Sequence, residues 1–132
     1  IAATEASLYA GIAAMRVGGR LYATGEAVEA SIDAAAERDG RTYGIVDEYG
    51  GHGIGTEMHE EPQVPNYRTG RPGRKLEPGL CLAIEPMFTL GRHEAFLAPD
   101  DWTIVTRDGS LAAHFENTIA ITESGPQILT AL

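Results

Sequence analysis

The sequence predicts an α+β domain in which two helices precede a run of antiparallel strands. Two alanine-rich segments at the start carry apolar residues at helical spacing. From Arg41 onward, short apolar segments alternate with clusters of glycine, proline and aspartate. Helices followed by strands, rather than alternating with them, are typical of the α+β class, and 132 residues suffice for one domain.

The first helix is predicted over residues 1–16, because Leu8, Ile12 and Met15 share one helical face. Two glycines at positions 18 and 19 end it. The second helix is predicted over about 24–38, with Thr24 as its N-cap and a carboxylate in its first turn. Together the two segments predict a helical hairpin.

The strands are predicted from apolar runs between turn residues. They are expected over residues 43–46, 81–88, 102–106, 112–122 and 127–129. The segment 61–78 is polar and contains several prolines and glycines, so we expect it to be a long loop.

Composition excludes several classes of protein. Ten basic and nineteen acidic residues give a net charge of −9, the wrong sign for a protein that binds the phosphate backbone of DNA. The single cysteine, Cys81, forms no intrachain disulfide, which fits a reducing compartment and predicts a cytoplasmic location. Because no apolar run approaches the roughly 20 residues of a membrane span, no membrane partner is expected.

Two histidines lie near a glycine-rich segment. His52 stands between glycines, which leave its ring unshielded and allow the backbone to approach a ligand. His59 precedes two glutamates, but the spacing of a zincin helix is absent. Each has an alternative interpretation, as an exposed histidine of a flexible loop or a surface histidine beside solvated acids.

Two glutamates interrupt otherwise apolar strands. Glu85 lies in the run 81–88, where burial without a partner would be costly, and Pro86 keeps it extended. Strand alternation places Glu116 on one face with His114. His52, Glu85 and Glu116 would supply nitrogen and oxygen ligands for a divalent ion. The alternative is an edge strand with Glu85 turned to water.

Other chemistry is less well supported. Dinucleotide, P-loop and serine-nucleophile motifs are absent, and Cys81 lies in an apolar strand where thiols are usually inert. One basic cluster is present, formed by Arg68, Arg71, Arg74 and Lys75. It is either a solvated loop or a contact for an acidic partner such as RNA.

Four segments, in this order and at this spacing, resemble those of bacterial type I methionine aminopeptidases. They are residues 51–62 (GHGIGTEMHEEP), 80–87 (LCLAIEPM), 101–106 (DWTIVT) and 115–118 (FENT). The resemblance covers essentially the whole chain, residues 1–132, but only the C-terminal half of the family's catalytic domain. It implies one half of a pita-bread fold, a helical hairpin followed by an antiparallel sheet.

The resemblance also implies a mechanism. His52, Glu85 and Glu116 would be ligands of two divalent metal ions (Co, Mn, Fe, Zn or Ni), with Glu116 bridging. His59 and Glu85 would be catalytic, the first as donor to the developing oxyanion and the second as proton shuttle. Met58, His59 and Trp102 would bind the substrate, the N-terminus of a nascent polypeptide from which methionine is removed.

The chain departs from the family in three respects. Asn117 replaces a histidine, and His114 replaces a glutamine on the expected ligand face. The family's two aspartate ligands and a further catalytic histidine belong to the N-terminal half, so the site is incomplete here and the chain alone is expected to be inactive.

Two other functions are compatible with these residues, and the incomplete site indicates that the chain has partners. The alternatives are a non-catalytic pita-bread binding protein and a related peptidase for X-Pro bonds. We expect the chain to associate with its missing half or with itself, and the basic cluster to be a possible ribosome contact.

Overall fold

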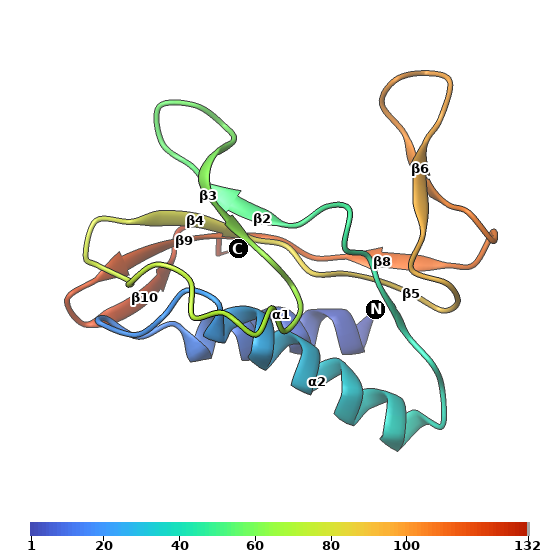
Figure 1. Cartoon of the computed structure of the whole chain (residues 1–132), viewed down its shortest axis with the longest axis horizontal. Helices are drawn as coiled ribbons and strands as arrows, with labels where there is room; N and C mark the ends of the chain where they lie inside the picture. Colours follow the sequence, from blue (N-terminus) through green and yellow to red (C-terminus); the bar gives the residue numbers. More distant parts are fainter. Residues whose placement is uncertain (132) are drawn as a thin grey trace.

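The computed structural model describes residues 1–131, and its two helices cover one side of an antiparallel sheet (Figure 1). Helix α1 spans Ala2–Ala14 and helix α2 spans Ala23–Asp39. The helices approach closely at Gly11, where a Cβ atom would lie 2.7 Å from a methyl group of Val28. Gly40, in the left-handed conformation, ends α2.

Both helices lie where the sequence predicts them, with two differences at their ends. Helix α1 ends at Ala14, two residues before the predicted boundary. The prediction that Thr24 caps α2 is wrong, because Tyr22 occupies the N-cap position and makes no capping hydrogen bond with its side chain. Thr24 is buried against α1 instead, so packing between the helices decides its position.

The larger sheet is antiparallel and has the strand order β10-β9-β4-β2-β3. Its strands are β2 (Gly51–Gly53), β3 (Glu60–Val64), β4 (Cys81–Ile84), β9 (Asn117–Thr122) and β10 (Gly125–Ile128). A smaller sheet has the order β1-β5-β8 and consists of β1 (Gly44–Ile45), β5 (Met87–Thr89) and β8 (Ala112–His114). Strands β6 (Ala95–Leu97) and β7 (Ile104–Thr106) form a separate hairpin.

Three strands, β2, β3 and β6, were not predicted from the sequence. Strand β3 overlaps the start of the predicted loop 61–78, because the prolines that suggested a loop are tolerated on an edge strand. Strand β6 was not expected at all. The hairpin that it forms with β7 and the loop between β2 and β3 both rise from the sheet on the side away from the helices (Figure 1).

The predicted strands 81–88 and 112–122 are each divided into two, and the two breaks lie opposite each other. Strand β4 pairs with β9 as far as Ile84 and Asn117, and β5 pairs with β8 from Met87 and His114 onward. Two residues on each side, 85–86 and 115–116, therefore lie outside both ladders. One cause is proline 86, which has no amide hydrogen to donate.

The apolar core lies between the helices and the sheets. Its main cluster consists of Leu8, Ile12, Met15, Leu21, Val64, Leu76, Leu82, Ile84, Ile119 and Ile121. A second cluster joins Ala3, Val28, Ile32, Ala35 and Phe88. The opposite face of the sheet has no helix over it among residues 1–131 (Figure 1). Neither of the two helices is long and apolar enough to span a bilayer.

Candidate metal centre

The interruption of the two strand ladders places two glutamates beside each other. Glu85 follows β4 and Glu116 precedes β9, at the junction between the larger and the smaller sheet. The amide of Phe115 donates to the carbonyl oxygen of Pro86 across the gap, at 3.4 Å. A backbone hydrogen bond therefore bridges the gap between the two ladders.

His52 lies on β2, next to β4, and its flanking glycines have a structural reason. A Cβ atom on Gly51 would lie 2.2 Å from the carbonyl oxygen of Ala83, and one on Gly53 would lie 2.3 Å from that of Glu61. The glycines thus allow β2 to pass between β4 and β3. The alternative of a flexible loop around His52 is wrong, because these residues form a central strand.

The ring of His52 is held by its own backbone. Its Nδ1 lies 2.8 Å from the carbonyl oxygen of Gly53, and because that oxygen only accepts, the ring hydrogen is on Nδ1. Its Nε2 faces Oε1 of Glu85 at 3.3 Å. A neutral imidazole would then direct a lone pair at a carboxylate, an arrangement that a cation between the two atoms stabilises. This is the pattern usual for a metal-ligating histidine.

Glu85 is the best enclosed of these side chains, at 12% exposure. The alternative in which it turns to water from an edge strand is wrong, because β4 is central in the sheet and the carboxylate lies between two imidazoles. Its second oxygen, Oε2, lies 3.3 Å from Nε2 of His114. Its backbone carbonyl accepts a hydrogen bond from Nδ2 of Asn66 at 3.1 Å. Asn66 is buried, and it holds the backbone from which the carboxylate projects.

Three side chains form what we term the acid–histidine cluster: Glu85, His114 and Glu116. One ligand atom from each lies within 4.8 Å of the other two. Hydrogen bonding to Glu85 raises the pKa of His114 above its ordinary value, and the negative charges of Glu85 and Glu116 act in the same direction. Partial burial opposes this rise in the pKa.

The predicted ligands are therefore brought together in part. His52 contacts Glu85, and Glu85 lies with Glu116, but the mutual cluster contains His114 in place of His52. Strand alternation predicts that His114 shares a face with Glu116, and in the structure Nε2 of His114 contacts Oε2 of Glu85. Asn117 makes a different contact, donating to Oγ1 of Thr130 at 2.9 Å.

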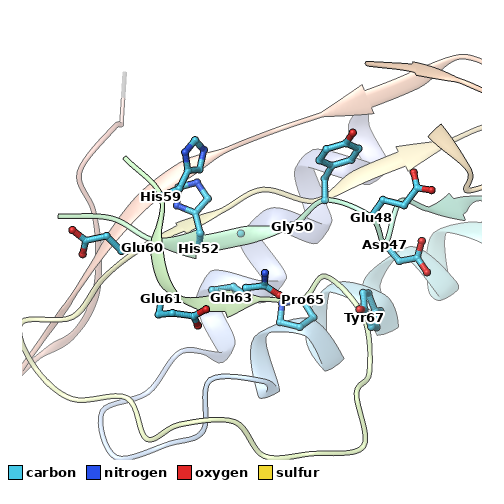
Figure 2. Close-up of a pocket in the computed structure, with 13 residues that line it drawn as sticks. Asp47, Glu48, Gly50, His52, His59, Glu60, Glu61, Gln63, Pro65 and Tyr67 are labelled. Atoms are coloured by element: carbon cyan, nitrogen blue, oxygen red, sulfur yellow. The ribbon is translucent and has the colours of Figure 1, made fainter. Parts of the chain in front are cut away.

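The predicted substrate-binding residues lie on the loops of the same face. The ring of His59 lies 4.4 Å from that of His52, centroid to centroid, and Figure 2 shows the two rings side by side. Met58 is 70% exposed on the loop between β2 and β3, and Trp102 is 86% exposed on the hairpin of β6 and β7. The two loops stand apart (Figure 1).

A cleft of about 480 Å³ adjoins the two histidines. Four carboxylates contribute to its lining: Asp47, Glu48, Glu60 and Glu61 (Figure 2). Such a lining attracts cations and positively charged groups.

The basic cluster is partly neutralised. Arg68 donates to Glu29 and lies 3.3 Å from Asp33, so its charge is satisfied by helix α2. This contact leaves Arg71, Arg74 and Lys75, all exposed, as the remaining members.

Comparison with known proteins decides the family. The profile of "Metallopeptidase family M24" matches residues 1–123. The chain belongs to this family. The methionine aminopeptidase 1 of Mycobacterium tuberculosis is 54% identical over 130 residues, which are 97% of this chain and 48% of that protein. The methionine aminopeptidase of Clostridium acetobutylicum is 47% identical over 132 residues, 98% of this chain and 50% of that protein.

Solved structures agree with this M24 assignment. The methionine aminopeptidase of Thermotoga maritima superimposes with a TM-score of 0.90 at 39% identity, over 100% of this chain and 51% of that one. The prolidase of Pyrococcus furiosus, at 20% identity and a TM-score of 0.68, shares the fold over 99% of this chain and 31% of that one. The predicted resemblance and α+β class are confirmed. The chain spans about half the length of the methionine aminopeptidases it matches.

Membership of a metallopeptidase family and the acid–histidine cluster both support the use of divalent metal. The donors are imidazole nitrogens and carboxylate oxygens, which suit divalent transition metals.

Proposed function

We propose that the chain is the C-terminal half of the catalytic domain of a methionine aminopeptidase, which removes the N-terminal methionine of nascent proteins. The observation that carries the proposal is that Glu85, at an interruption of the sheet, contacts His52 and lies in one cluster with Glu116. Relatives of 47–54% identity carry the name methionine aminopeptidase.

The proposed metal centre holds two divalent ions, with Co, Mn, Fe, Zn and Ni as candidates. His52, Glu85 and Glu116 are its ligands from this chain, and the lone pair of His52 facing Glu85 fits a cation between them. When bound, such ions lower the pKa of a water molecule and polarise the scissile carbonyl. The remaining ligands come from the other half of the domain, and without them the chain alone is inactive.

The side chains of this chain perform the remaining tasks. Glu85 takes the proton of the attacking water and returns it to the amine that leaves when the peptide bond breaks. His59, next to His52, donates a hydrogen bond to the oxyanion that forms on the scissile carbonyl. Met58 and Trp102 supply apolar surface for the unbranched methionine side chain.

Exposed apolar side chains on the hairpin of β6 and β7 support a covering partner. Phe96, Leu97, Ile104 and Val105 are each 37–48% exposed. Adjacent exposed apolar residues mark an interaction surface. We assign to it the missing half of the domain or, in its absence, a second copy. The ribosome contact is assigned to Arg71, Arg74 and Lys75.

Methionine release from a Met-Ala peptide by the full-length protein, with added Co²⁺ or Mn²⁺, tests the function. We expect release that disappears in Glu85→Gln, and little cleavage of an Ala-Pro peptide. A folded, metal-loaded protein without methionine release would favour the non-catalytic alternative. Preference for Ala-Pro would instead favour an X-Pro peptidase.

A further inference from the structure

We propose that His114 is itself a metal ligand, and that with Glu85 and Glu116 it coordinates one divalent cation. This inference rests on the proposed function and adds a nitrogen donor to the ligands considered so far. It concerns a residue at which the chain departs from the methionine aminopeptidase pattern.

The distances in the cluster are compatible with coordination of a cation. Nε2 of His114 lies 3.3 Å from Oε2 of Glu85. Two ligands about 2.1 Å from a metal lie about 3.4 Å apart in a tetrahedral site. A carboxylate oxygen of Glu116 lies within 4.8 Å of a ligand atom of Glu85 and of one of His114.

The orientation of His114 follows from the strand that carries it. Phe115, the next residue, packs against the main apolar core on the helix side of the sheet. Because side chains alternate along an extended chain, His114 and Glu116 project together to the opposite face. Register adds to this placement, because His114 pairs with Met87, two residues beyond Glu85.

The two imidazoles that face Glu85 do not compete for the same atom. His52 faces Oε1 and His114 faces Oε2. His114 is 45% exposed and Glu116 is also exposed, so both side chains are accessible to a cation from solvent.

Zinc binding to the full-length protein, with the apoprotein titrated with ZnCl₂ in a calorimeter, tests the inference. We expect His114→Gln to weaken one Zn²⁺ site by about tenfold or more. His93→Gln, which removes an exposed histidine outside the cluster, is the matched control and leaves the affinity unchanged. X-ray absorption at the zinc edge gives the number of bound imidazoles, which falls by one in His114→Gln and stays constant in His93→Gln.

The alternative outcomes separate the roles of His114. An affinity and imidazole count in His114→Gln equal to those of the unmodified protein would overturn the inference. Weaker binding with an unchanged imidazole count would also overturn it, because His114 would then only position Glu85. Failure of the unmodified protein to bind zinc would overturn it as well. Methionine release is measured separately and tests the proposed function. The proposed function and the role of His114 can therefore each fail without the other.

Discussion

Replacement of Gly51 by alanine tests the physical reason for the glycine that precedes His52. The added Cβ atom would lie 2.2 Å from the carbonyl oxygen of Ala83 and 3.1 Å from Cβ of Val64. The first of these contacts is with backbone of the neighbouring strand β4, which has no rotamer to change. Strands β2 and β4 would therefore have to separate by roughly 1 Å to restore van der Waals contact.

The expected cost follows from this displacement. Overpacking of a well-packed site costs about 1–3 kcal/mol, and each weakened hydrogen bond between the strands adds up to about 1 kcal/mol. Alanine restricts the unfolded chain more than glycine does, which offsets about 0.4–1 kcal/mol of this cost. We expect Gly51→Ala to lower the free energy of unfolding by about 3 kcal/mol, a drop in melting temperature of about 10 °C.

The assay is thermal or urea unfolding followed by circular dichroism, with Gly50→Ala as the matched control. A Cβ on Gly50 would lie 3.2 Å from the carbonyl oxygen of Val64, so a shift of a few tenths of an ångström accommodates it. We expect a change within about 1 kcal/mol for this control. Equal stabilities for the two variants would refute the argument that strand packing requires Gly51.

Three further predictions follow from other contacts. Asn66→Ala removes the donor to the backbone carbonyl of Glu85, and we expect urea unfolding to show a loss of about 1–3 kcal/mol; an unchanged midpoint would contradict this. Hydrogen bonding, chiefly from the backbone of Arg92, lowers the pKa of Asp108 to about 2. The stability that ionised Asp108 gives the folded state is therefore complete above pH 3.8 and is lost as the pH falls through about 2. An Asp108 carboxyl resonance that titrates near 3.8 by NMR would refute this prediction. Sedimentation of the 132-residue chain at high concentration should show self-association, which Phe96→Ser and Val105→Ser together weaken; a monomer at all concentrations would exclude it.

The sequence predicts the helices well because their signals are local. Helical spacing of apolar residues depends on side chains three or four positions apart, and the segments found this way lie within two residues of α1 and α2. Strand β3 fails the same kind of reasoning, because whether a proline is tolerated depends on its place at the edge of the sheet.

The candidate site divides in a similar way. The sequence alone singled out Glu85 and Glu116 as carboxylates in apolar strands, and the four motifs predicted the family that comparison confirmed. The contacts of His114 and Asn66 with Glu85 span 29 and 19 positions of the chain, and no local pattern indicates them.

What the sequence determined by itself was the α+β class, the helical hairpin, the family and the type of donor at the metal centre. Only the tertiary structure decided that two predicted strands break at the same level, and that Glu85 thereby lies between His52 and His114. It also decided why glycines flank His52. The physical reason is the same in each case: register between strands and close approach of backbones are set by packing across the sheet, which the order of residues along one strand does not contain.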